Sequence, residues 1–237
     1  MSKLTAAAVL SATALAASVS SADLLTMSGS SGSKAASVQL NLSGDSLTVV
    51  LTNTSLADVM VPADVLTAVF FHIEGAPVSL TPVSAVLTAG SSVILDSQPA
   101  GGIVGGEWAY LGSLAESGIL SGSNHGISSS GLGIFGGPSF PGDNLDGPAA
   151  VNGLQYGLTS AGDNPATGNG GIMGSGGLIK NSVTFTFSGA TGLSLSQVRS
   201  AYFLYGTAVG EGGFAVPTPG VTALFGITAT LASRRRR

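Results

Sequence analysis

Few side chains in this sequence are of the types that catalyse reactions, and they follow no recognised catalytic pattern. Glu107 and Glu116 could act as a glycosidase pair, which needs two carboxyl groups about 5 to 9 Å apart. Glu107 is expected on a strand and Glu116 in a loop, so we interpret both as solvated carboxylates. His72 with Asp64 and a serine could form a catalytic triad, but no nucleophile-elbow motif accompanies them.

The histidines have simpler structural interpretations. His72 follows two phenylalanines in an apolar run, and we expect a strand residue with one satisfied ring nitrogen. His125 lies in a Ser-Gly-Ser-Asn-His-Gly segment, and we expect it to face water. The chain is therefore predicted not to be an enzyme and to need no cofactor.

Calcium is the metal that the sequence favours most, because hard cations bind carboxylate and carbonyl oxygens on flexible loops. One polar loop contains Asp143, Asn144 and Asp146. A second polar loop contains Asp163, Asn164 and Asn169. The spacing of an EF-hand is absent. Because Asp and Asn also form Asx turns, simple turn chemistry remains the alternative to a calcium site.

The composition excludes several other classes of function. The chain has 237 residues, of which only 8% are charged, and it contains no cysteine. This removes thiol catalysis, thiolate metal sites and disulfides. All twelve acidic residues lie between Asp23 and Glu211, where the basic residues are only Lys34, Lys180 and Arg199. A body of this charge repels phosphate backbones, so no nucleic-acid partner is expected.

Residues 1–22 have the pattern of a secretory signal peptide. Lys3 supplies a positive charge, residues 4–19 form an apolar run, and Ser20 and Ala22 are small. We predict export through the Sec translocon and cleavage by signal peptidase between Ala22 and Asp23. A buried N-terminal helix is the alternative, but no polar face interrupts the run.

Residues 217–237 form a second targeting segment. Pro217, Thr218 and Pro219 precede a mostly apolar stretch over residues 221–232. Twelve residues give about 18 Å of helix, which is short of the roughly 20 residues needed to span a bilayer. The chain then ends in Arg234, Arg235, Arg236 and Arg237. Such a cluster stays in the cytoplasm by the positive-inside rule, and an uncleaved tail anchor is the simpler alternative.

Signal peptide, body, Pro-x-Pro, short apolar helix and arginine cluster together resemble the exosortase-sorted surface proteins, known as PEP-CTERM proteins. Thr218 stands where the family motif usually has glutamate. The resemblance implies that an exosortase, a membrane-embedded cysteine transpeptidase, recognises the Pro-x-Pro segment while the arginines retain the tail. It further implies transient anchoring in the inner membrane and transfer of the body to the cell surface. Residues 178–207, which end in Tyr-Gly-Thr, also resemble the last core strands of such bodies.

Residues 23–216 are predicted to form one all-β body, an antiparallel β-sandwich of jelly-roll-like type. Period-2 alternation on both sides of Gly44 and Asp45 predicts a hairpin over residues 37–54. Further strands are expected over residues 24–28, 65–73, 78–87, 92–95, 107–111, 154–159, 178–187 and 201–207. Long Gly- and Ser-rich surface loops are expected over residues 118–177. The predicted core includes Val38, Leu40, Val49, Phe70, Val183, Phe185 and Phe203.

These features favour an exported, non-catalytic cell-surface or extracellular-matrix protein processed by an exosortase, with exopolysaccharide as a candidate partner. One alternative is a secreted carbohydrate-binding module that presents Trp108, Tyr110 and Tyr156 on its surface. The other is a secreted hydrolase that uses Glu107 or Glu116.

Overall fold

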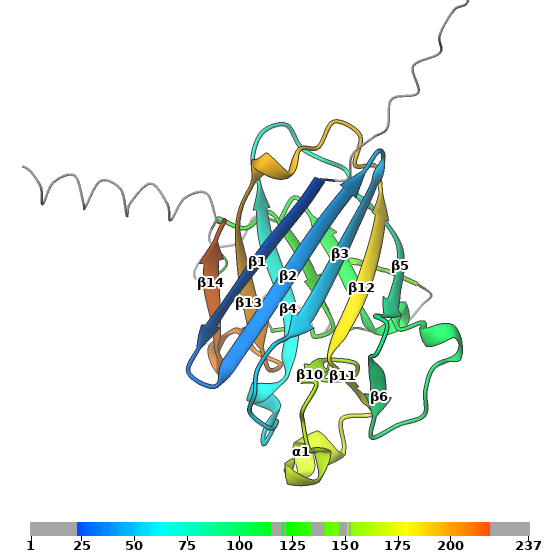
Figure 1. Cartoon of the computed structure of the whole chain (residues 1–237), viewed down its shortest axis with the longest axis vertical. Helices are drawn as coiled ribbons and strands as arrows, with labels where there is room; N and C mark the ends of the chain where they lie inside the picture. The colour runs from blue at the N-terminus through cyan, green and yellow to red at the C-terminus, as the bar shows by residue number, and fades with distance from the viewer. Residues whose placement is uncertain are drawn as a thin grey trace, which may run out of the picture.

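The computed structural model describes residues 23–114, 120, 122–133, 140–146, 151 and 153–218. The predicted signal peptide and C-terminal apolar helix lie outside these residues. Five strands form the first sheet, in the spatial order β1-β2-β3-β12-β5, and it lies in front in Figure 1. Its strands are β1 (Asp23–Ser31), β2 (Lys34–Ser43), β3 (Ser46–Asn53), β12 (Ser182–Ser188) and β5 (Thr81–Leu87).

The second sheet has nine strands and is organised around β4 (Leu66–Ile73). One edge of β4 pairs with β13 (Val198–Tyr205), which pairs in turn with β14 (Gly213–Pro217). The other edge of β4 pairs with both β8 and β10, which lead to β7 and β9 and to β11 and β6. These strands are β6 (Ser92–Ile94), β7 (Ala109–Gly112), β8 (His125–Ser128), β9 (Asp143–Asn144), β10 (Leu158–Thr159) and β11 (Leu178–Lys180).

The all-β class predicted from the sequence is confirmed. Every strand pair is antiparallel except β10 with β11, which run parallel over two residues. Within the described residues the α-helical structure is α1 (Gly170–Met173), a single turn of four residues. The other helical segments are 3-10 turns at η1 (Pro62–Asp64), η2 (Ala100–Gly102), η3 (Gly105–Glu107), η5 (Pro165–Thr167), η6 (Leu195–Gln197) and η7 (Val209–Glu211). None of these described helices is long and apolar enough to cross a membrane.

The hairpin of β2 and β3 forms as its alternation predicts. Ser43 faces Ser46 across a two-residue loop in which Gly44 has φ of 60°. A positive φ at the first loop residue suits a tight hairpin turn and costs glycine little. The apolar residues of both strands point inward, and Val38, Leu40 and Val49 are fully buried.

Aromatic rings join the two sheets in the main core. Trp108 lies just before β7, and its ring centroid is 5.0 Å from that of Phe185 on β12. Tyr110 on β7 lies 4.9 Å from Phe187, two residues further along β12. All seven residues predicted to be core are fully buried. The period-2 pattern therefore identified the buried face of each of these strands.

The Gly- and Ser-rich region is not simply a set of surface loops, and that prediction is wrong in part. Residues 125–128 form β8, which pairs with β4 and β7 and is buried throughout. A second apolar cluster covers the outer face of β4, where Phe70 packs against Phe140 at 6.5 Å between ring centroids. Leu120, Leu132 and Val151 from the same region are buried in this cluster. β4 is therefore covered on both faces, as its continuous apolar run predicts.

Candidate functional site

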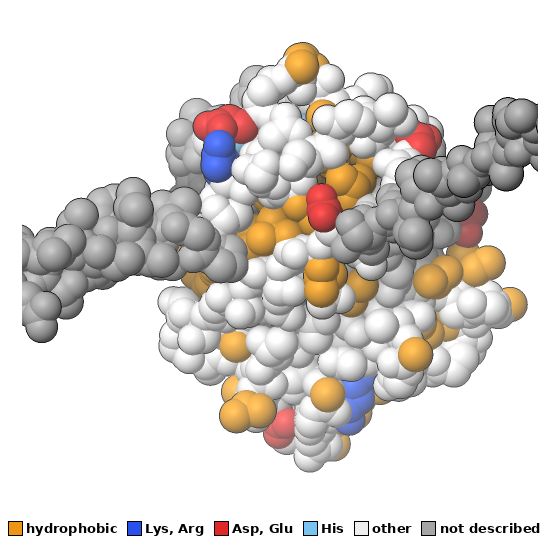
Figure 2. Space-filling model, turned by 45° about the horizontal axis from the view of Figure 1, so that its top comes forward, with side chains coloured by type: hydrophobic (Ala, Val, Ile, Leu, Met, Phe, Trp, Pro, Cys, Tyr) orange, Lys and Arg blue, Asp and Glu red, His pale blue; other side chains and the backbone are white. Residues whose placement is uncertain are grey.

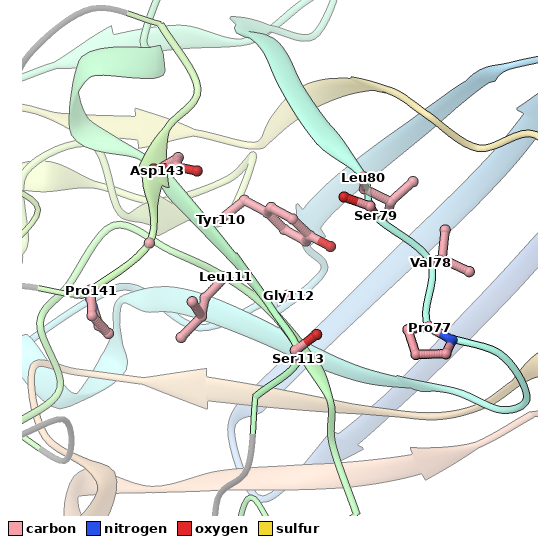
Figure 3. A pocket seen from close by; sticks show the side chains of 11 residues that line it. Pro77, Val78, Ser79, Leu80, Tyr110, Leu111, Gly112, Ser113, Pro141 and Asp143 are labelled. Atoms are coloured by element: carbon pink, nitrogen blue, oxygen red, sulfur yellow. The ribbon is translucent and has the colours of Figure 1, made fainter.

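One concave feature among the described residues is a pocket at one end of β7, with a volume of about 300 Å³. Three segments line it: residues 77–80, which lead into β5, residues 110–113 of β7 and its exit, and residues 141–143, which lead into β9. Figure 3 shows the Tyr110 ring extending from β7 toward residues 77–80, with the Ser79 and Ser113 hydroxyls turned toward the same space. The lining thus brings three hydroxyl groups together.

Tyr110 is the deepest polar side chain of this pocket. Its residue surface is only 4% exposed, and its hydroxyl is buried without a hydrogen-bond partner. Burial also raises the pKa of the phenol well above its usual range, so the hydroxyl stays protonated. A Cβ atom at Gly112 would lie 2.9 Å from this hydroxyl, so the glycine leaves the space beside it open. A buried hydroxyl without a partner costs about 1 to 3 kcal/mol, and a bound group that pairs with it recovers this energy.

His125 lies behind the pocket and does not face water, so that prediction is wrong. The residue is 3% exposed and its ring stacks on Phe71 at 5.5 Å between centroids. The Asn124 amide is oriented by two hydrogen bonds to the Ile73 backbone, each 2.8 Å long. Its oxygen therefore faces His125 Nδ1 at 2.8 Å, so Nδ1 is the nitrogen that carries the proton. Burial lowers the pKa of His125 to about 4.

This depressed pKa predicts a loss of stability on mild acidification. Between pH 6.5 and about 4 the unfolded chain binds a proton at His125 that the folded chain does not. The free energy of unfolding therefore decreases as the pH is lowered through this interval. The full shift corresponds to about 3 kcal/mol. His125→Gln should flatten the dependence of urea unfolding on pH over this interval. Equal slopes in wild type and His125→Gln would contradict the prediction.

The groups suggested for catalysis are not brought together. Asp64 in η1 and His72 lie at opposite ends of β4, and the Asp64 carboxylate accepts the N–H groups of Met60 and Val61. His72 lies on β4, as expected, and its Nδ1 is buried without a hydrogen-bond partner. Glu107 lies in the 3-10 turn η3, not on a strand as predicted, and burial raises its pKa. Glu116 lies outside the described residues.

The two polar loops considered for calcium differ in what their side chains do. Asp143 and Asn144 form β9, and the Asn144 amide donates to the Gly106 carbonyl at 2.7 Å. Asp146 is exposed in the segment that follows. No group of three or more carboxylate or imidazole side chains close enough to share a metal ion occurs in the described part of the chain. A calcium site in the first loop therefore remains a prediction.

In the second loop the predicted turn chemistry is present. Asp163 is buried and accepts the Val59 N–H at 2.7 Å. Asn164 caps η5 through the Ala166 N–H, and Asn169 caps α1 through two backbone N–H groups. These three side chains therefore accept hydrogen bonds from backbone N–H groups and stabilise the turns of the loop.

The aromatic residues proposed as a sugar-binding surface are mostly inside. Trp108 is fully buried and Tyr110 nearly so, while Tyr156 is half-buried. Trp108 therefore cannot present a stacking face to a ligand, and this part of the prediction is wrong. The Tyr110 ring packs against Phe187 and His125, so it is not free to stack on a sugar, and the hydroxyl is the part of this side chain left to bind one.

The predicted sorting segment begins at the last two residues that the structure describes, Pro217 and Thr218. Pro217 is the last residue of β14 and is paired in register with Ser200. Both the backbone N–H and the hydroxyl of Thr218 donate to the Arg199 carbonyl, at 3.1 and 3.2 Å. The backbone at Pro217 and Thr218 is therefore paired with β13 and not free. Pro219 and the arginines at 234–237 lie outside the described residues.

At the other end, Asp23 opens β1 and pairs in register with Leu42, while Ala22 lies outside the described residues. Charged side chains are few and scattered on the face that Figure 2 shows. Among the described residues one ion pair is formed, between Arg199 and Glu74.

No protein-family model, no curated protein and no solved structure matches the chain significantly.

Proposed function

We propose that this chain is an exported, non-catalytic cell-surface or extracellular-matrix protein, with a C-terminal tail that an exosortase processes. In this proposal residues 1–22 direct export and residues 23–216 form the mature body, a jelly-roll-like β-sandwich. Residues 217–237 hold the precursor in the inner membrane until the tail is cut.

The observation that carries the proposal is the coincidence of two boundaries. The sequence places the Pro-x-Pro motif at residues 217–219, and β14 ends at Pro217. Thr218 is 8% exposed and is fixed to Arg199 by two hydrogen bonds. Loss of the residues beyond Thr218 removes none of the described strands of either sheet. This supports a tail that is removed after folding.

The contacts of Thr218 also bear on where the tail is cut. A protease that needs an extended, free backbone must either pull Thr218 from the Arg199 carbonyl or act beyond Thr218. We propose the second, because it leaves β14 and both of these hydrogen bonds intact in the product.

The experiment is to read both ends of the mature protein from the surface of its native host by mass spectrometry. The N-terminal peptide should begin at Asp23 or within a few residues of it, because Ser20 and Ala22 suit signal peptidase. Peptides beyond the motif, above all those containing Arg234, should be absent. Surface protein that begins at Met1, or that yields Arg234 peptides, contradicts the proposal and leaves a plain tail anchor.

A second candidate function is carbohydrate binding. The structure favours the pocket at Tyr110 as the place for a sugar, because the aromatic rings expected on the surface are mostly buried. The alternative of a secreted hydrolase has no comparable support, because Asp64 and His72 lie at opposite ends of β4 and Glu116 lies outside the described residues.

A further inference from the structure

We infer that the pocket at Tyr110 binds an uncharged sugar unit of about hexose size, with the Tyr110 hydroxyl as its anchor. The inference is independent of how the chain is exported or processed. It rests on the unpaired buried hydroxyl, on the other groups that face it and on the charge of the lining.

The first argument is the state of the Tyr110 hydroxyl. It is buried and has no hydrogen-bond partner, although phenols in protein interiors almost always find one. The phenol is both a donor and an acceptor, so it can satisfy both needs of one ligand hydroxyl. Figure 3 shows the Tyr110 ring pointing toward residues 77–80, which line the pocket with it, and a Cβ atom at Gly112 would lie 2.9 Å from the hydroxyl. In this inference a ligand hydroxyl that enters through the pocket supplies the missing partner.

The second argument is the arrangement of the other polar groups. Ser79 and Ser113 come from two different segments, and their hydroxyls turn toward the space that Tyr110 reaches (Figure 3). Ser113 has φ of 56°, in the left-handed region that side chains other than glycine seldom adopt. Strain of this kind at the rim of a pocket is typical of functional positions. Several hydroxyl groups converging on one space match a ligand that carries several hydroxyl groups of its own.

The third argument is charge and size. Asp143 is the only charged residue among the described residues that line the pocket. No Lys, Arg or His stands there to hold an anion, so a phosphate, sulfate or uronic acid is disfavoured. Pro77, Leu80 and Leu111 supply apolar surface for the C–H faces of a ring. A volume of about 300 Å³ is at the lower end for small-molecule pockets, which suits one sugar residue and not a long oligomer.

Gly112 gives the site an internal check. A methyl group at this position would lie 2.9 Å from the Tyr110 hydroxyl, in the space that a ligand hydroxyl would use. Gly112 follows Tyr110 by two residues on β7, so both face the same side of the strand. Gly112→Ala therefore obstructs the anchor without removing it, while Tyr110→Phe removes the anchor without adding volume.

The test uses the full-length chain, purified in a detergent whose headgroup is not a sugar. Saturation-transfer NMR measures binding of glucose, galactose, mannose and N-acetylglucosamine, with glucuronate as the anionic comparison. We expect at least one neutral sugar to bind saturably with a Kd of about 1 to 10 mM, as suits a small open site. Tyr110→Phe should raise this Kd about tenfold, the usual effect of one lost hydrogen bond. Gly112→Ala should raise it at least as much.

Tyr205→Phe is the matched control. Tyr205 is a fully buried tyrosine on β13 that does not line this pocket, so its removal should change the Kd less than about twofold. If Tyr110→Phe does not fold, judged by circular dichroism, Gly112→Ala carries the comparison alone. The inference is overturned if no neutral sugar binds saturably up to about 50 mM. It is also overturned if the folded pocket variants bind as wild type does, or if glucuronate binds as tightly as the neutral sugars.

Discussion

Replacing Arg234, Arg235, Arg236 and Arg237 with serine is expected to release uncleaved protein into the medium of the native host. The apolar run at residues 221–232 is too short to be a secure anchor by itself. Its retention depends on charges that resist passage through the bilayer, at about 2.5 to 3.5 kcal/mol for each charged residue at its centre. Without them the tail follows the body across the membrane before the protease acts.

The motif variant should fail in the opposite way. Replacing Pro217 and Pro219 with alanine should leave a precursor that still carries the arginines and stays in the membrane fraction. Alanine at 217 adds a backbone N–H at the end of β14 and frees φ, so the fixed extended entry to the tail is lost. Immunoblots of medium, membrane and surface fractions distinguish the released form, the trapped form and the processed form.

Arg199→Ser is the matched control for the arginine variant. It removes an arginine and the ion pair with Glu74, but the group that holds Thr218 is the Arg199 carbonyl, which serine also provides. Processing should therefore be unchanged. If the chain with serines at residues 234–237 were processed normally, the hypothesis that an exosortase processes the tail would be wrong.

The sequence predicted the fold best where each strand carries its own alternation. The hairpin of β2 and β3 and the doubly covered β4 were placed within a few residues, whereas the single strand expected over residues 178–187 is divided into β11 and β12, which belong to different sheets. The hairpin strands and β4 each have an apolar pattern that local geometry alone converts into a buried face.

β8 could not be predicted in this way. Its sequence is His-Gly-Ile-Ser, with one apolar side chain in four, and this pattern is typical of a loop. It becomes a central strand because β4 and β7 pair with it on both sides and because the cluster around Phe140 covers β4 nearby. Pairing over such separations in sequence is a tertiary effect that a local pattern does not contain.

The candidate site was predicted only in part. Tyr110 was singled out, but as an exposed stacking ring, and its hydroxyl was not considered. A usable signal was present in the sequence, where Trp108, Tyr110 and Gly112 alternate, and the last two share one face of β7. Two large aromatic side chains followed by a glycine on the same side of the chain indicate a well-packed surface with an unfilled space beside the glycine. Ser79 and Ser113 carried no signal, because only the fold brings their segments together.

Phe185→Ala is expected to be the most destabilising single substitution discussed here, at about 3 to 5 kcal/mol. Phe185 is fully buried in the middle of β12, an inner strand of the five-stranded sheet, and is paired in register with Val49 on one side and Ala85 on the other. Its ring meets Trp108 of the second sheet edge-on, with an interplanar angle of 61°. Alanine would remove the main contact that this position makes across the core, leaving a cavity that paired strands on both sides cannot collapse.

Urea unfolding measures this loss directly. Trp108 is the only tryptophan in the chain, and it lies against the substituted ring, so its fluorescence reports the separation of the two sheets. Because domains are stable by only about 5 to 15 kcal/mol, the variant should have lost a large fraction of its stability. Phe185→Leu should lose less, since it refills part of the volume.

Val83→Ala supplies the control for this comparison. Val83 lies on the neighbouring strand β5 but is 53% exposed, so the same kind of truncation should change the free energy of unfolding by less than about 0.5 kcal/mol. The difference between the two variants isolates packing between the sheets from the loss of side-chain volume on a strand. If Phe185→Ala unfolded within about 1 kcal/mol of wild type, the Trp108–Phe185 contact could not be what holds the sheets together.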